Sequence, residues 1–117
     1  MAINLSTLVN QTNPLQLCKA WVNFNGTTAT IRSSYNVSSV TKSAAGFYGI
    51  NFATPLADAN YSVASSTSRT NTGSAILVVN SLAAVPQSTT AVFVSNLNAT
   101  TGTGIDEPIL SVQIFGN

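Results

Sequence analysis

The acidic side chains are the first place to look for chemistry, and the chain has three: Asp58, Asp106 and Glu107. A glycosidase usually places two carboxylates about 5 to 10 Å apart, flanking the scissile bond. Asp106 and Glu107 are sequence neighbours, so in an extended chain their side chains point apart, and Asp58 lies in a segment typical of a turn. The chain contains no histidine, which excludes a Ser-His-Asp triad, a Cys-His pair and a His-bearing zinc site. We therefore expect a protein that is not an enzyme.

The adjacent pair Asp106 and Glu107 also raises the question of a metal site. Calcium takes six to eight oxygen ligands, and three chains around one axis would triplicate a single carboxylate. The surrounding residues have no specific ligand spacing. We favour a solvated loop at this position, and expect neither a metal ion nor a cofactor.

Cys18 is the only cysteine, and it has three interpretations. It is a small buried hydrophobic residue, one half of an interchain disulfide, or a nucleophile. A nucleophile needs a base that forms the thiolate, and the chain offers no imidazole for that purpose. We favour the buried residue.

Two segments, 65–74 and 98–108, are longer and more polar than a hairpin turn requires. Long loops on a rigid scaffold are where binding usually resides. Arg69 is a lone charge in the first segment, and its planar guanidinium suits carboxylates, phosphates and sugar hydroxyls; an ordinary solubilising role is the alternative. The residues that we predict for a binding site are Arg69, Thr70, Asn71, Asn98 and Thr100.

Trp21 is the only tryptophan. An exposed indole ring can stack on a sugar, so a binding platform is one interpretation. Trp21 follows Lys19 and Ala20 in the middle of an expected strand. There we favour packing in the core or at a subunit interface.

The polarity of the chain comes from hydroxyls and amides rather than from ions. Ser, Thr and Asn supply 43 of the 117 residues, while charged residues make up 6%, against about 25% in a typical domain. The net charge of +1 leaves no basic stripe for nucleic acid. The longest strongly apolar run, residues 75–79, is far below the ~20 residues that a membrane-spanning helix needs. We expect neither a nucleic-acid partner nor membrane insertion.

From Cys18 onward, apolar and polar residues alternate with a period of two, which is typical of half-buried antiparallel strands. One such run extends from Ala29 to Val37, and Asn25-Gly26 before it predicts a hairpin turn because both residues tolerate positive φ. About eight strands of this kind indicate one all-β domain over residues 18–117, an antiparallel β-sandwich or jelly roll. The residues expected in its core are Val22, Phe24, Ile50, Phe52, Val63, Val92, Val94, Val112 and Ile114.

Residues 1–17 differ from this pattern. Leu5, Leu8 and Val9 have loose helical spacing, and the proline at position 14 would end any helix. We expect a stalk segment that packs against neighbouring chains; a disordered leader is the alternative. Sheets normally protect their edges with charges, and the sparse charge of this chain therefore predicts oligomerisation.

Several motifs lie between Cys18 and Tyr61: KAWVNFNG from Lys19, GFYGINF from Gly46 and PLADANY from Pro55. Together they resemble the C-terminal tip domain of tailed-bacteriophage tail fibres, including fibres of cyanophages. The resemblance implies a homotrimeric β-sandwich at the distal end of a virion tail fibre, joined to the rest of the fibre and recognising a host cell-surface receptor. That receptor would be a glycan, lipopolysaccharide or other outer-membrane component. Tyr48-Gly49 departs from the aromatic and β-branched pair expected there.

Three functions remain in competition. A receptor-binding tip predicts trimers that bind cells. A non-catalytic carbohydrate-binding module of a larger enzyme predicts a monomer with an aromatic platform, and a structural virion decoration protein predicts assembly without cell binding. We favour the receptor-binding tip.

Overall fold

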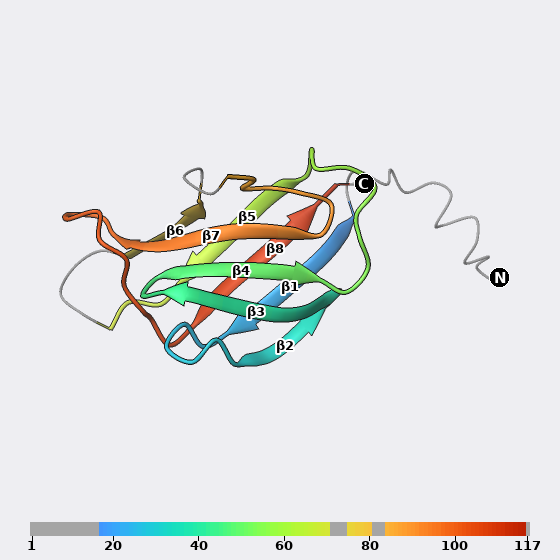
Figure 1. The fold of residues 1–117 in the computed structure, drawn as a ribbon. Coiled ribbons are helices and arrows are strands. Elements are labelled where there is room, and N and C mark those ends of the chain that lie inside the picture. Colours follow the sequence, from blue (N-terminus) through green and yellow to red (C-terminus); the bar gives the residue numbers. More distant parts are fainter. Residues whose placement is uncertain (1–16, 71–74, 81–83, 117) are drawn as a thin grey trace, which may run out of the picture.

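The computed structural model describes residues 17–70, 75–80 and 84–116, which form two antiparallel sheets (Figure 1). Sheet A has the strand order β2-β1-β8-β5, and sheet B has the order β3-β4-β7-β6. The strands are β1 (Cys18–Phe24), β2 (Ile31–Tyr35), β3 (Val37–Ala44), β4 (Phe47–Phe52), β5 (Ser62–Thr67), β6 (Ala75–Val79), β7 (Ala91–Asn98) and β8 (Leu110–Phe115). The prediction of an all-β sandwich with about eight strands is confirmed. A helix that could cross a membrane is absent from the described residues.

The pairing of β1 with β8 defines the two ends of the sandwich. Cys18 lies opposite Phe115 at one end, and Phe24 lies opposite Leu110 at the other. We name them the Cys18 end and the Leu110 end. The connections after β1, β3 and β7 and residues 68–70 after β5 lie at the Leu110 end, and the connections after β2 and β4 and residues 84–90 before β7 lie at the Cys18 end (Figure 1).

The core is formed by the inward faces of both sheets. Of the nine predicted core residues, eight are buried, and Val63 is partly buried against them. Two aromatic pairs fill the space between the sheets edge to face: the ring centroids of Phe24 and Tyr48 are 5.1 Å apart, and those of Phe52 and Tyr61 are 5.8 Å apart. Alternation along each strand therefore identified the core face correctly.

The alternating run from Ala29 to Val37 is not one strand. It breaks at Asn36, which has a φ of 54°, so that β2 ends at Tyr35 in sheet A and β3 begins at Val37 in sheet B. Asparagine adopts this left-handed conformation more readily than other residues with a Cβ. The chain changes sheet at a single residue, and the side-chain alternation passes through the break.

Asn25-Gly26 begins a hairpin loop as predicted, but for a different reason. The positive φ of this loop, 61°, belongs to Ala29. A Cβ on Gly26 would lie 2.5 Å from the carbonyl oxygen of Glu107 and 2.8 Å from the hydroxyl of Tyr48. Close packing of the backbone selects glycine here.

Candidate functional site

Four of the five predicted binding residues are described, and all four lie at the Leu110 end: Arg69, Thr70, Asn98 and Thr100. The fifth, Asn71, lies outside the described residues. The predicted stalk segment 1–17 also lies outside them, with the exception of Leu17. The binding role and the stalk both stay predictions.

Thr70 is held by Glu107, a residue of the other long loop. The backbone nitrogen and Oγ1 of Thr70 donate to Oε2 of Glu107 over 2.9 and 2.8 Å. The Glu107 side chain is 0% exposed, and within the described part of the chain its Oε1 has no hydrogen-bond partner. The predicted solvated loop is therefore wrong at Glu107. A buried carboxylate needs hydrogen-bond donors. Thr70, which supplies them, is 37 positions away in the sequence, so a local pattern could not reveal this contact.

The two loops are joined a second time beside Thr70. The backbone nitrogen of Ser68 donates to the carbonyl of Ile109 over 2.8 Å, and the backbone nitrogen of Ile109 donates to Oγ of Ser68 over 3.1 Å. Arg69 lies between Ser68 and Thr70 and is exposed. Its backbone is thus flanked by two anchored residues.

Asp106 binds a different set of donors from its neighbour Glu107. Lys42 Nζ lies 2.6 Å from Oδ2, while the backbone nitrogen of Gly46 and the hydroxyl of Tyr48 donate to Oδ1 over 2.9 and 2.8 Å. Burial raises the pKa of Asp106, but the hydrogen bonds from Lys42, Gly46 and Tyr48 outweigh it and hold the pKa below its ordinary value. Asp106 is therefore ionised at neutral pH and serves as an anchor for three segments.

Tyr48 connects this anchor to the core. Its hydroxyl lies 2.8 Å from Oδ1 of Asp106 and 2.7 Å from the carbonyl oxygen of Gly26, and its ring packs against Phe24. Burial, followed by the hydrogen bond to Asp106 and the charge of that carboxylate, raises the pKa of Tyr48 above its ordinary value. The phenol stays protonated and acts as a structural donor.

Asn98 shapes the turn that carries Thr100. Its Oδ1 accepts hydrogen bonds from the backbone nitrogens of Thr100 and Thr101 over 2.9 and 3.2 Å. The backbone nitrogen of Gly102 donates to the carbonyl of Asn98 over 2.7 Å, which closes the turn. Thr70 therefore lies against the base of this loop through Glu107, whereas the exposed Thr100 lies near its tip.

Trp21 is not in the core. Val22 and Phe24 take the inward positions of β1, with 1% and 0% of their surface exposed, so Trp21 points to the outer face of sheet A and is half-buried there. It lies opposite Tyr35 on one side and Gln113 on the other. Tyr35 is 57% exposed. The predicted core position of Trp21 is wrong, and its packing at a subunit interface stays a prediction.

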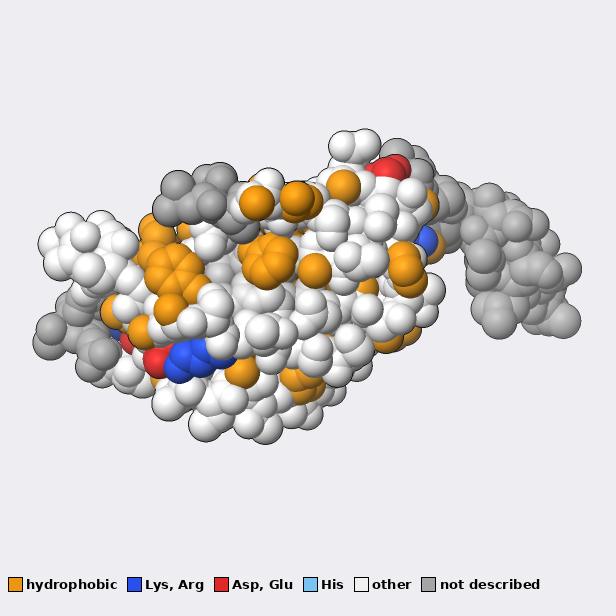
Figure 2. All heavy atoms as spheres, viewed as in Figure 1, with side chains coloured by type: hydrophobic (Ala, Val, Ile, Leu, Met, Phe, Trp, Pro, Cys, Tyr) orange, Lys and Arg blue, Asp and Glu red, His pale blue; other side chains and the backbone are white. Residues whose placement is uncertain are grey.

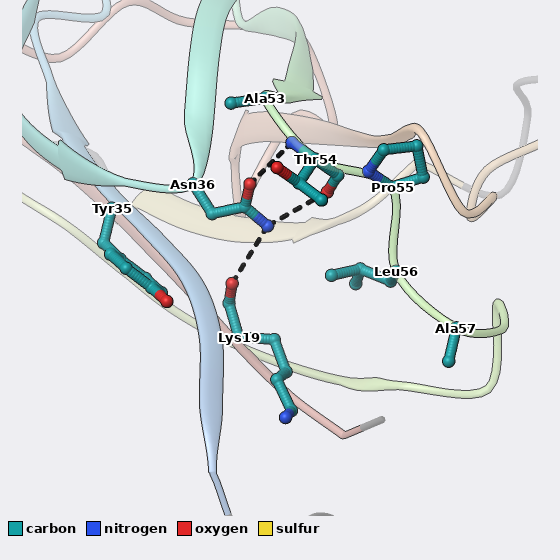
Figure 3. Close-up of a pocket in the computed structure, with 8 residues that line it drawn as sticks. All are labelled: Lys19, Tyr35, Asn36, Ala53, Thr54, Pro55, Leu56 and Ala57. Carbon is teal, nitrogen blue, oxygen red and sulfur yellow. Dashed lines mark hydrogen bonds between the residues drawn. The ribbon is translucent and has the colours of Figure 1, made fainter.

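A cavity of about 530 Å³ opens beside Tyr35 at the Cys18 end (Figure 3). The start of β1, the junction of β2 with β3 and the loop after β4 meet there. The described residues that line it are Lys19, Tyr35, Asn36, Ala53, Thr54, Pro55, Leu56 and Ala57. Lys19 is the one charged residue among them. No sequence pattern pointed to this cavity, because its walls come from three separate segments.

Asn36 fixes one wall of the cavity. Its Nδ2 donates to the carbonyls of Lys19 and Thr54, each over 3.1 Å, and its Oδ1 accepts a hydrogen bond from the backbone nitrogen of Thr54 over 2.7 Å (Figure 3). These bonds hold the left-handed backbone of Asn36 and tie β1 to the loop after β4.

Other reactive groups are engaged in packing or hydrogen bonding. Cys18 is half-buried, and its Sγ lies 3.4 Å from the carbonyl oxygen of Ala20. The residues that the structure describes bring no three metal-ligating side chains together. Both side-chain oxygens of Asp106, and Oε2 of the adjacent Glu107, accept hydrogen bonds from separate structural donors. Their arrangement suits loop anchoring better than acid–base chemistry.

No protein-family model matches the chain, and neither a curated protein nor a solved structure matches it. Three features of the molecule bear on its function: the anchored loops of the Leu110 end, the cavity of the Cys18 end and the two outer faces of the sandwich.

Proposed function

We propose that this chain is the receptor-binding tip domain of a bacteriophage tail fibre, which attaches the virion to a glycan, lipopolysaccharide or other surface component of the host cell. The observation that carries the proposal is a pair of polar segments at the Leu110 end, residues 68–70 and 98–108, that are held by hydrogen bonds. Exposed Arg69 and Thr100 lie there on segments held by Glu107 and Asn98. Anchored loops lose little conformational entropy on binding, which favours recognition by polar side chains.

The direction of β1 supports the distal location. The strand begins at Cys18 and ends at Phe24, beside the loops of the Leu110 end. A fibre that continues into Cys18 would therefore point these loops away from its shaft. Residues 1–17 are the proposed stalk that joins the domain to the rest of the fibre.

A homotrimer is part of the proposal, and the outer face of sheet B supports self-association. Ile76, Val78 and Phe93 on β6 and β7 are about 40% exposed, at 43%, 40% and 38% (Figure 2 shows hydrophobic side chains over β7). In addition, β6 is an edge strand with the sequence AILVV, which contains no charge or proline. Such an edge pairs with other chains unless it is covered.

The aromatic pair on sheet A favours a second function, a non-catalytic carbohydrate-binding module. Trp21 and Tyr35 lie side by side in the strand register on the outer face. Amide and hydroxyl side chains of Gln113, Asn23 and Ser111 occupy neighbouring positions of that face. A module of this kind would be a monomer, and its loops would not have to bind cells.

Solution mass separates these two functions. We expect light scattering to give a mass near three chains for the purified protein. Ile76→Lys should reduce the mass to that of one folded chain, while Ser66→Lys, on an exposed position of sheet A, should leave the trimer intact. A sharp monomer peak of the unaltered chain at micromolar concentration would contradict the fibre tip and favour the carbohydrate-binding module.

Adsorption tests the attachment itself. We expect the labelled trimer to bind cells in a panel of bacteria, and Arg69→Ala to reduce that binding without unfolding the protein. A stable trimer that binds none of the cells would contradict receptor binding and favour a structural decoration protein.

A further inference from the structure

The cavity beside Tyr35 lies at the opposite end of the sandwich from the proposed attachment loops. We propose that it binds one unit of an anionic saccharide, a pyranose that carries a carboxylate or a phosphate. The inference relies on the proposed function only in expecting a saccharide at a cell surface. Its site and its test are separate from those of the loops.

The walls of the cavity suit a sugar ring. Tyr35 is 57% exposed, and in Figure 3 its ring lies on one side of the space and Leu56 on the other, with Lys19 between them. The face of an aromatic ring carries partial negative charge, which attracts the polarised C–H groups of a pyranose. Pro55, an exposed residue of the loop after β4, adds apolar surface to the lining, while Leu56 is 8% exposed and belongs to the core beneath it.

The charge at the cavity selects an anion. Lys19 is a cation, and none of the described residues that line the cavity is Asp or Glu. Asp58 follows the lining residue Ala57 but is not among the lining residues, and its Oδ1 accepts a hydrogen bond from the backbone nitrogen of Asn60 over 2.8 Å. An ammonium group acts as a point charge toward carboxylate or phosphate oxygens.

The cavity is also large enough and already formed. Its volume of about 530 Å³ falls within the range of roughly 300 to 1,000 Å³ that is usual for small-molecule sites. Asn36 joins the carbonyl of Lys19 to the loop at Thr54, so the wall does not have to assemble around a ligand. A preformed wall lowers the entropy lost on binding.

A longer saccharide would have room to continue from the cavity across sheet A. Trp21 is the next residue of that face, opposite Tyr35 in the strand register. Beyond it, Nδ2 of Asn23 donates to Oγ of Ser111 over 3.2 Å, and Arg32 donates to Oδ1 of Asn23 over 3.2 Å. The face therefore offers a second ring for stacking, followed by amide, hydroxyl and guanidinium groups for hydrogen bonds.

The test is a titration of ¹⁵N-labelled protein followed by amide chemical shifts. The probes are D-glucuronic acid, glucose 6-phosphate, D-glucose and inorganic phosphate. We expect at least one of the two anionic sugars to shift the signals of Asn36, Thr54 and Leu56 with a dissociation constant in the range of about 1 to 10 mM. The tighter binder of the two shows whether the site prefers a carboxylate or a phosphate on the sugar. Glucose and inorganic phosphate should each bind at least about tenfold more weakly.

Three results of the titration would overturn the inference. The first is equal affinity for glucose and for the anionic sugars, and the second is equal affinity for inorganic phosphate, which would indicate an unspecific anion site. The third is the absence of saturable shifts with either anionic sugar up to about 100 mM.

Substitutions locate the site. Tyr35→Ala and Lys19→Gln should each weaken binding of the anionic sugar by about five- to tenfold. Both changes leave the bond between Asn36 and the carbonyl of residue 19 in place, because that bond uses backbone of β1. Phe93→Ala, which removes an exposed ring on sheet B, is the matched control for Tyr35→Ala and should leave the affinity unchanged. Undiminished binding by Tyr35→Ala or by Lys19→Gln would overturn the assignment.

The two proposals fail separately. Cell adsorption that depends on Arg69, without binding of either anionic sugar, would overturn the cavity and leave the fibre tip standing. Sugar binding by a chain that adsorbs to no cell would overturn the fibre tip and leave the cavity standing.

Discussion

At the Leu110 end a lysine is paired with an aspartate, whereas at the Cys18 end a lysine borders a cavity that no described carboxylate lines. Lys42 donates to Oδ2 of Asp106 over 2.6 Å and to the carbonyl of Thr27 over 2.9 Å. Lys19 contributes its backbone carbonyl to Asn36 and its ammonium to the border of the cavity. The same residue type thus stabilises loops at one end and lines a cavity at the other.

The two ends also differ in how their backbones are held. At the Leu110 end, Glu107 and Asp106 hold several segments, and Asn98 closes a turn. At the Cys18 end, the three hydrogen bonds of Asn36 connect the segments around the cavity. In a chain with few charges, the loops at the Leu110 end are held by one buried carboxylate, Glu107, and one partly buried carboxylate, Asp106. At the Cys18 end, one asparagine holds the point where the chain passes from one sheet to the other.

The core that both ends share sets the largest expected effect. Phe52→Ala should lower the free energy of unfolding by about 3 to 5 kcal/mol, because the ring is 7% exposed and packs on Tyr61. Urea unfolding followed by the fluorescence of Trp21 measures this loss. Tyr35→Ala, on the outer face of sheet A, should cost far less, because that side chain is 57% exposed. A loss below about 1 kcal/mol for Phe52→Ala would contradict its burial.

Asn36 tests the dependence of the Cys18 end on one residue. Asn36→Ala should lower the free energy of unfolding by about 2 to 3 kcal/mol, since it removes three hydrogen bonds and leaves a Cβ on a left-handed backbone. Asn36→Gly should recover about 1 kcal/mol of that loss, because glycine adopts this φ without strain. Equal losses for the two variants would show that the backbone conformation carries no cost.

Thr70 tests the anchoring of the Leu110 end. Thr70→Val keeps the shape of the side chain but removes a hydroxyl that donates to the buried carboxylate of Glu107. We expect a loss of about 1.5 to 3 kcal/mol in unfolding free energy, the usual range for a hydrogen bond to a charged group. Thr100→Val, on the exposed turn, is the matched control and should be nearly neutral. Equal small losses at both positions would show that the hydrogen bond from Thr70 to Glu107 does not stabilise the Leu110 end.

Acid should weaken the Leu110 end through Asp106. Its pKa is lower in the folded than in the unfolded chain, so the folded state binds fewer protons. The stability from Asp106 is therefore complete above the unfolded pKa of about 4, and it is lost as the pH falls through the lower folded pKa. Between about pH 5 and about pH 2, the unfolding free energy of the unaltered chain should fall more steeply than that of Asp106→Asn. Parallel curves would contradict the lowered pKa.

Arg69→Ala should have the smallest effect on stability, within about 0.5 kcal/mol, because the residue is exposed. Its effect should instead appear in reduced adsorption to cells. That adsorption should depend little on salt, since a net charge of +1 gives weak long-range attraction. Unchanged adsorption by a folded Arg69→Ala trimer would remove this residue from the attachment site. A steep loss of adsorption between low and physiological salt would contradict the weakly charged mechanism.

Alternation predicted the strands and the core because each strand has one face toward the other sheet. The same alternation also implied that Trp21 points away from the core. Since Val22 and Phe24 point inward, the residue before them in the alternation must point outward. The large apolar ring of Trp21 suggested burial, and here the strand geometry outweighed residue type.

The sequence could not show the burial of Glu107 or the presence of the cavity. Glu107 is buried because Thr70, 37 positions away, supplies its donors. The cavity arises where three segments meet around Asn36, a residue that an alternating pattern treats as one more polar position. Both features depend on contacts between distant parts of the chain, which a local pattern does not contain.

The position of β1 in the middle of sheet A determines how the domain carries mechanical force. It pairs with β2 on one side and with β8 on the other, and its start and the attachment loops lie at opposite ends. Tension between a fibre pulled at Cys18 and a receptor held at the Leu110 end would run along this strand. The hydrogen bonds on both of its sides would then be loaded in shear and share the force, rather than opening one after another like a zipper. Resistance to such pulling is set by the rate of forced unfolding, so a domain loaded in this geometry would stay folded longer than one whose strands open in turn.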